Sequence, residues 1–192
     1  LGHTYAMHWR FYQYKTARNL WKSPLHDELS DQGACFGEVG GYERPNWFGC
    51  DVIKPIYKYT YQKQNWFDCS AAEHIAVRES TGLYDISSFG KFEISGVGAL
   101  PTLQRLSCAD IDIEIGKVVY TQWLNDRGGI EADLTIARLK EDRFRITTGI
   151  GSLNRDWWRL KHHLEPDSKL VDQTMNYACL ALQGPNSRDL LQ

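Results

Sequence analysis

Two carboxylates, Glu131 and Asp133, are the residues of this sequence best placed for acid–base chemistry. They stand two positions apart in a run rich in apolar residues, and side chains at i and i+2 of a strand point to the same side. A carboxylate that loses water beside apolar neighbours holds its proton more tightly and becomes a better base. The spacing leaves a second interpretation open, in which both carboxylates lie on the solvated face of an antiparallel hairpin.

Other patterns that could carry chemistry are weaker. Gly96 and Gly98 lack the third glycine of a dinucleotide-binding turn. His162 and His163 end a predicted helix, where they suit its dipole better than a metal, and we expect no metal site. The cysteines are odd in number and widely spaced, which favours free thiols in a reducing compartment over a disulfide framework. They are Cys35, Cys50, Cys69, Cys108 and Cys179.

The elements that must position Glu131 and Asp133 form a predicted β-hairpin. Alternating runs at 117–124 and 130–139 flank a glycine-containing turn at 125–129. Further expected elements are a capping-box helix from Ser70, a half-buried strand at 91–95, a helix from Leu100 to Leu106, a strand around 144–148, a helix with apolar positions Leu153, Trp157, Leu160 and Leu164, and a strand at 177–183. Helices that segregate from a largely antiparallel sheet predict the α+β class.

The first 68 residues are less regular. A short helical pattern at 27–29 stands in an otherwise irregular, aromatic stretch, and residues 49–68 resemble an aromatic linker that packs against a neighbour. The chain of 192 residues has a net charge of −2 and no basic run, so we expect no nucleic-acid partner. Apolar runs shorter than the roughly 20 residues of a bilayer span predict no membrane partner. A start at Leu1 and an end at Gln192 predict an internal part of a longer protein.

Three ordered blocks resemble the aminomethyltransferase (glycine-cleavage T-protein) family. The first is G-L-Y-D-I-S-S-F-G-K at 82–91. The second is G-K-V-V-Y-T at 116–121 with L-N-D-R-G-G-I-E-A-D-L-T at 124–135, and the third is L-Q-G-P-N-S-R at 182–188. The resemblance implies a T-protein-like domain, with an antiparallel sheet and flanking helices.

Two departures narrow the resemblance. Ala132-Asp133 stands where T-proteins usually have Asp-Asp, and Ser88-Phe89 stands where they have His-Met. Both forms resemble the folate domain of dimethylglycine and sarcosine dehydrogenases or oxidases. Segments 17–20, 23–27 and 43–48 resemble the module that precedes that domain. The resemblance therefore implies two parts, a linker module at 1–54 and the front of a folate-binding domain at 55–192.

This resemblance implies an enzyme with a divided reaction in one-carbon metabolism. A flavin domain outside this chain, with FAD, oxidises an N-methyl amino acid, and electron-transfer flavoprotein is an expected partner. The domain in this chain binds tetrahydrofolate and forms 5,10-methylenetetrahydrofolate, with Asp133 assisting proton transfer. The residues that the resemblance places in the folate pocket are Tyr120, Phe89, Glu131, Thr147 and Gly149. Thr147 and Gly149 replace a Val and an Asn of T-proteins, and Gly149 cannot supply the amide. We expect Asp133 to project into an aromatic-lined hollow behind Tyr120.

Two alternatives remain open. One is the non-catalytic regulatory subunit of pyruvate dehydrogenase phosphatase, with which residues 13–18 are compatible. The other is a stand-alone aminomethyltransferase. The expected location is the mitochondrial matrix in a eukaryote and the cytoplasm otherwise. The choice between dimethylglycine and sarcosine depends on the flavin domain, and the distal half of the folate pocket is expected beyond Gln192.

Overall fold

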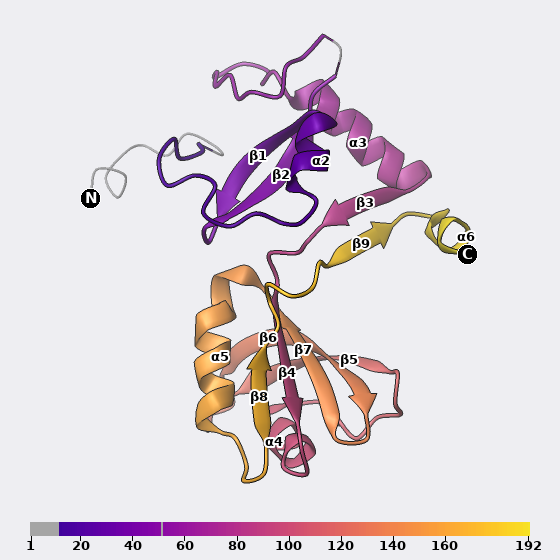
Figure 1. The fold of residues 1–192 in the computed structure, drawn as a ribbon. Coiled ribbons are helices and arrows are strands. Elements are labelled where there is room, and N and C mark those ends of the chain that lie inside the picture. The colour runs from indigo at the N-terminus through magenta and orange to yellow at the C-terminus, as the bar shows by residue number, and fades with distance from the viewer. Residues whose placement is uncertain (1–11, 51) are drawn as a thin grey trace. The chain divides into compact units, whose positions relative to one another are not determined.

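A computed structural model describes residues 12–50 and 52–192 (Figure 1). The chain divides into two compact units. The first comprises residues through Ile86 together with Leu180–Gln192, and the second comprises Ser87–Cys179. Both combine helices with antiparallel strands, which confirms the predicted α+β class.

The first unit contains two separate strand pairs. Its elements are α2 (His26–Asp31), β1 (Ala34–Val39), β2 (Tyr42–Phe48), α3 (Phe67–Glu79), β3 (Gly82–Asp85), β9 (Leu180–Gln183) and α6 (Ser187–Leu191). Strands β1 and β2 form an antiparallel hairpin with a bulge between Cys35 and Phe36. The sequence predicts α2 but no strands here, because Gly37 and Pro45 interrupt the alternation that would indicate them.

An aromatic cluster fills the space beside this hairpin. The Trp47 side chain is only 1% exposed, and its ring lies 6.1 Å from that of Tyr57 and 6.4 Å from that of Trp66. Tyr59 stacks on Tyr57 with ring centroids 5.5 Å apart. The prediction that residues 49–68 pack against a neighbouring element is therefore confirmed, and the neighbour is β2.

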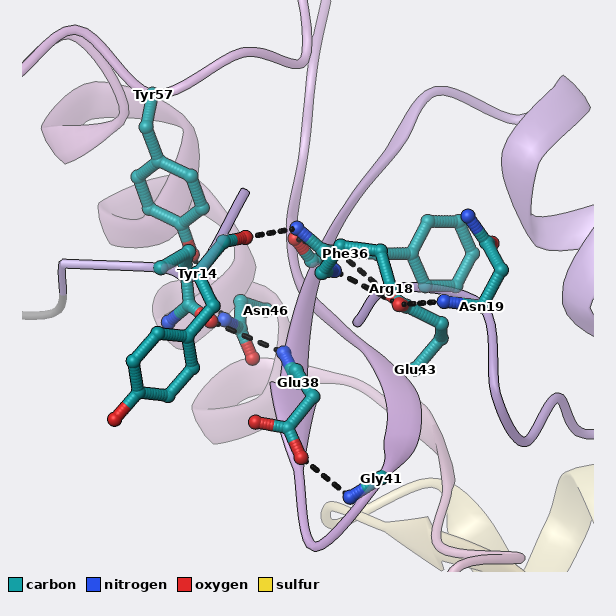
Figure 2. A network of polar contacts seen from close by, with 10 residues as sticks. Tyr14, Arg18, Asn19, Phe36, Glu38, Gly41, Glu43, Asn46 and Tyr57 are labelled. Carbon is teal, nitrogen blue, oxygen red and sulfur yellow. Dashed lines mark hydrogen bonds and ion pairs between the residues drawn. The ribbon is translucent and has the colours of Figure 1, made fainter. Parts of the chain in front are cut away.

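An ion pair between half-buried Arg18 and buried Glu43 holds the segment before α2 against the hairpin (Figure 2). Arg18 donates to both carboxylate oxygens of Glu43, at 2.8 and 2.5 Å, and the Asn19 N–H donates to the same carboxylate at 2.7 Å. Arg18 also donates to the carbonyl oxygens of Tyr14 and Phe36. The hydrogen bond from Arg18 holds the pKa of Glu43 below its usual value, despite burial of the carboxyl group.

Helix α3 begins earlier than the sequence predicts. Ser70 and Glu73 are expected to form a capping box, but the helix starts at Phe67 and its N-cap, Trp66, makes no side-chain capping bond. The capping-box prediction is therefore wrong. Glu73 instead accepts a hydrogen bond from the Phe48 backbone N–H at 2.7 Å, which joins α3 to the end of β2.

The third sequence block docks on the other end of α3. Gly184 has a φ of +121°, and a Cβ there would lie 2.3 Å from the carbonyl oxygen of Ser80 and 2.8 Å from that of Val77. Only glycine fits this close backbone approach without strain. The Asn186 N–H then donates to the Ser80 carbonyl at 3.1 Å. The block therefore ties the chain after β9 to the end of α3.

The second unit is a five-stranded antiparallel sheet with helices. Its elements are β4 (Gly90–Ser95), α4 (Ala99–Leu106), β5 (Val118–Leu124), β6 (Ile130–Lys140), β7 (Arg143–Thr148), a short 3-10 helix (Ile150–Ser152), α5 (Leu153–His162) and β8 (Lys169–Asp172). The strand order is β5-β6-β7-β4-β8 (Figure 1). The predicted hairpin, third strand and two helices are confirmed, although α5 ends before Leu164.

One face of this sheet carries the hydrophobic core. Leu103 of α4, Leu160 of α5 and Trp123 of β5 are fully buried in one cluster with apolar residues of β4, β6 and β7. Those strand residues are Phe92, Ile94, Ala132, Leu134, Ile136, Phe144 and Ile146. The two helices therefore cover a single face and leave polar side chains on the other.

Two strand predictions need correction. The strand at 91–95 is expected to be half-buried, but Lys91 and Glu93 are 3% and 4% exposed, since the 87–89 segment contacts the Lys91 side chain and two arginines of β7 contact Glu93. The strand expected at 177–183 is limited to 180–183 and pairs with β3 rather than with the larger sheet. Strand β3 corresponds to the short strand that the sequence indicates before Ser87, whereas β8 is not predicted from the sequence.

The linker–domain division that we expect after residue 54 does not coincide with a boundary of these units, which fall after Ile86 and Cys179. Residues 1–11 and 51 of the expected module lie outside the described part. The division of the sequence into a linker module at 1–54 and a folate-binding domain at 55–192 stays a prediction. Among the described residues, no helix has the length and apolar character needed to cross a bilayer.

Candidate functional site

The polar face of the five-stranded sheet brings together most of the predicted site residues. Strand register places Tyr120 opposite Thr135, and Gln122 opposite Asp133. Thr135 also pairs with Thr147 of β7, on its other side. Because paired residues of neighbouring strands share a face, Tyr120, Gln122, Asp133 and Thr147 lie on the side away from the core.

Tyr120 and Asp133 are diagonal neighbours across β5 and β6. The nearby Asp133 carboxylate raises the pKa of the Tyr120 hydroxyl. The Gln122 side chain opposes that shift in the pKa of Tyr120. The three side chains together offer a carboxylate, a hydroxyl and an amide on one small area of sheet.

Glu131 is held apart from this group. Its carboxylate accepts a hydrogen bond from the Asn125 side-chain amide at 2.8 Å. Asn125 also accepts from the backbone N–H groups of Arg127 and Gly129, so it organises the turn between β5 and β6. The register of β5 and β6 shifts at Glu131, which has no partner on β5, so the shared direction that the i, i+2 spacing predicts for Glu131 and Asp133 stays a prediction.

Phe89 and Gly149 lie at the end of the same sheet. Phe89 precedes Gly90, which pairs with Thr148, and Gly149 follows Thr148. A Cβ added to Gly149 would meet nothing within 4 Å, so a ligand can approach the backbone there. Phe89 is half-buried, and its carbonyl oxygen accepts a hydrogen bond from the Lys91 ammonium at 2.8 Å.

Lys91 is a buried cation that the sequence does not single out. Its Nζ also donates to the Ser87 carbonyl at 2.8 Å, and its backbone N–H donates to the Thr174 hydroxyl. Lys91 pairs with Thr147, so it lies on the same face as Asp133. These bonds join the Lys91 side chain, at the start of β4, to the backbone of the preceding segment from Ser87 to Phe89.

A second charged group on this face is also missed by the sequence reasoning. The nearly buried Glu93 accepts hydrogen bonds from Arg143 and from Arg145, with Arg145 Nη2 at 2.6 Å. The Arg145 guanidinium lies 4.4 Å from the centre of the Tyr177 ring. The alternation of Arg143, Arg145 and Thr147 with buried Phe144 and Ile146 is the signal that could have revealed this charged face.

The described residues do not form the enclosed hollow expected behind Tyr120. Tyr120 is 60% exposed and Asp133 is exposed, which agrees with the solvated-face alternative. A cavity of about 430 Å³ lies instead in the first unit, between β2, α3 and β3, and none of the six predicted site residues lines it. Among residues 12–50 and 52–192, no three His, Cys, Asp or Glu side chains gather as a metal site.

Comparisons with known proteins agree with the fold. The GCVT N-terminal domain family matches residues 25–192. The chain is 47% identical over 192 residues to 4-methylaminobutanoate oxidase (formaldehyde-forming) of Paenarthrobacter nicotinovorans. It is 38% identical over 187 residues to the mitochondrial pyruvate dehydrogenase phosphatase regulatory subunit of Mus musculus, and 32% over 215 residues to the mouse mitochondrial sarcosine dehydrogenase.

A solved structure of a related protein has a similar fold. The glycine cleavage system aminomethyltransferase T from Bartonella henselae superimposes with a TM-score of 0.72 and 27% identity, over 90% of this chain and 43% of that one. The three sequence relatives are matched over 100%, 94% and 91% of this chain, which spans 23%, 21% and 23% of their own lengths. The chain resembles dehydrogenases and oxidases of N-methyl amines, and it belongs to the GCVT N-terminal domain family.

Proposed function

We propose that this region binds tetrahydrofolate in a flavin-dependent enzyme that oxidises an N-methyl amino acid, and that it passes the oxidised carbon to the folate. The observation that carries the proposal is the Tyr120–Asp133 pair, located inside the family's second block on the polar face of the sheet. Two relatives, the methylaminobutanoate oxidase and the sarcosine dehydrogenase, support it because both names specify N-methylated amino acids.

The residues present fit a folate ring. A pterin is flat and carries hydrogen-bond donors and acceptors along its edges, and the polar face offers the Asp133 carboxylate, the Gln122 amide and the Thr147 hydroxyl. The open space above Gly149 lets a flat ring approach the backbone. When bound, tetrahydrofolate supplies the nucleophilic nitrogens that take up a one-carbon unit.

The chain's own residues would manage the proton in this reaction. Asp133 accepts a proton at a carboxylate oxygen, and the neighbouring Tyr120 hydroxyl lies on the same face of the sheet. The exposure of both side chains means that this unit alone does not exclude water from them. The proposal therefore includes a cover from elsewhere in a longer protein, which would hold the reactants together and limit the loss of formaldehyde.

The test uses the full-length protein with the substitution Asp133→Ala. We expect the flavin to be reduced at the wild-type rate by an N-methyl amino acid, while the product in the presence of tetrahydrofolate changes from 5,10-methylenetetrahydrofolate to free formaldehyde. Asp126→Asn, in the exposed turn after β5, is the matched control and should leave the product unchanged. An unchanged yield of methylene-folate from Asp133→Ala would refute the role of Asp133.

The regulatory relative provides a second candidate, supported by 38% identity. The two functions differ in the same assay. A non-catalytic protein would show no flavin reduction with sarcosine, dimethylglycine or 4-methylaminobutanoate. Tetrahydrofolate binding to the full-length protein, measured by calorimetry and lost in Asp133→Ala, would support the enzymatic role of this face.

A further inference from the structure

Two cysteine side chains of the first unit are in contact. The Sγ atoms of Cys50 and Cys69 are 3.9 Å apart, although 19 positions separate them in the sequence. Cys50 is exposed and Cys69 is half-buried, so a small oxidant can reach the pair from solvent. All five cysteines are free thiols in the structure, as the sequence predicts, but these two lie side by side.

The backbone at each cysteine is held by neighbouring structure. Cys50 exchanges two backbone hydrogen bonds with Ile53, at 3.0 and 2.9 Å, in an isolated antiparallel bridge after β2. Cys69 is in the first turn of α3, whose Glu73 bonds to the Phe48 N–H just before that turn. The two sulfurs thus lie 3.9 Å apart, and a disulfide requires their approach to about 2.05 Å.

We propose that Cys50 and Cys69 form a reversible disulfide, a modification site that fastens the start of α3 to the segment after β2. The oxidant is a small disulfide such as oxidised glutathione. The Cys50 thiolate attacks one of its sulfurs, forms a mixed disulfide and releases one glutathione thiolate. The Cys69 thiolate then attacks the Cys50 sulfur and releases the second glutathione. The two protons lost by the cysteines pass to the two glutathione thiolates, so two protein thiols are oxidised and one glutathione disulfide is reduced.

Local electrostatics make exposed Cys50 the better first nucleophile. Burial raises the pKa of Cys69, and so do the neighbouring Cys50 thiol and the carboxylates of Glu73 and Asp68. Asp68 is itself paired with the Lys63 ammonium at 2.6 Å. A raised pKa reduces the thiolate fraction of Cys69, so this residue suits the second step, in which the mixed disulfide holds the target sulfur beside it.

The bond would close a ring over residues 50–69. This ring contains Tyr57, Tyr59 and Trp66, which pack on one another and, through Tyr57 and Trp66, on Trp47. Oxidation therefore joins both ends of the aromatic segment covalently, while the aromatic contacts hold its middle. Reduction removes the covalent link and leaves the aromatic and backbone contacts of the segment in place.

The test exposes the full chain to glutathione buffers of increasing oxidised fraction, followed by alkylation and peptide mass spectrometry. We expect a cross-linked peptide that contains Cys50 and Cys69, and a loss of two alkylatable thiols that dithiothreitol reverses. After tryptic cleavage at Lys58 or Lys63, the peptide that contains Cys50 and the peptide that contains Cys69 should stay joined only in the oxidised protein. Cys69→Ser should trap Cys50 as a mixed disulfide with glutathione.

Cys108→Ser is the control, because Cys108 is an exposed thiol of the second unit and should not affect the cross-link. Recovery of Cys50 as the glutathione adduct to the same extent in wild type and in Cys69→Ser would overturn the proposal. Alkylation of both Cys50 and Cys69 in a buffer that modifies Cys108 would overturn it as well.

Discussion

The substitution Glu93→Gln tests whether the charged group on the polar face stabilises the second unit. Glu93 is 4% exposed and accepts hydrogen bonds from both Arg143 and Arg145. Glutamine keeps the size of the side chain but removes its charge, and its amide nitrogen cannot accept from a guanidinium. The two arginines would then lie side by side on β7 without a counter-charge.

The expected cost follows from how well water can reach the arginines. Removing one partner of a buried ion pair costs about 3–5 kcal/mol when the remaining charge stays buried. The Arg143 and Arg145 side chains are 38% and 30% exposed, so water can solvate part of each guanidinium. We therefore expect the lower end, a loss of about 3 kcal/mol in the free energy of unfolding.

Urea unfolding gives the free energy, and hydrogen exchange of peptides from β4 and β7 assigns the loss to the second unit. Glu141→Gln, an exposed charge change in the turn after β6, is the matched control. Ordinary surface substitutions change the free energy of unfolding by no more than about 0.5 kcal/mol. A change of that size for Glu93→Gln would refute the stabilising role of this ion pair.

The same variant predicts a pH dependence. Burial acts to raise the pKa of Glu93, but the hydrogen bonds from Arg145 and Arg143 outweigh burial and leave the pKa lowered. A lowered folded-state pKa gives stability that is complete above the unfolded value, about 4.3, and is lost as the pH falls through the folded value. The difference in the free energy of unfolding between the wild type and Glu93→Gln should stay constant from neutral pH to about 5. It should become smaller below about pH 4.

Three further substitutions test the rest of the fold. Glu43→Gln removes the negative charge and one of the two acceptor oxygens that Arg18 bonds, and should cost about 2–3 kcal/mol in urea unfolding near neutral pH; because the pKa of Glu43 is lowered, this cost should shrink as the pH falls below about 4. Leu103→Ala opens a cavity in the core of the second unit and should cost about 2–5 kcal/mol. Gly184→Ala should lower the melting temperature more than Gly128→Ala, since both have positive φ but only Gly184 faces a carbonyl oxygen at 2.3 Å.

Local patterns predict the second unit well. The hairpin of β5 and β6 follows from alternation around a turn that contains glycine, and α5 follows from its apolar spacing. The first unit is harder because its pairings are distant, and Gly82 pairs with Gln183 across the whole of residues 87–179. No short window of sequence contains both partners of that ladder.

The candidate site shows the same limit. The direction of Asp133 depends on its register with Gln122, and a bulge between Trp123 and Leu124 sets that register. A slip of one residue would turn Asp133 toward the core, so the sequence can suggest that Asp133 and Tyr120 share a face but cannot establish it. The exposure of that face depends on which other elements cover it, which the hairpin's own residues do not encode.

The pairing of β3 with β9 also determines when each unit can be completed during synthesis. Strand β3 leaves the ribosome before any residue of the second unit, and its partner β9 follows only after the last one. The second unit has all of its own strands by then and can fold first, since domains generally fold as units as they emerge. Until then β3 presents an unsatisfied edge, so the nascent chain should be most prone to mispairing and chaperone capture in that interval.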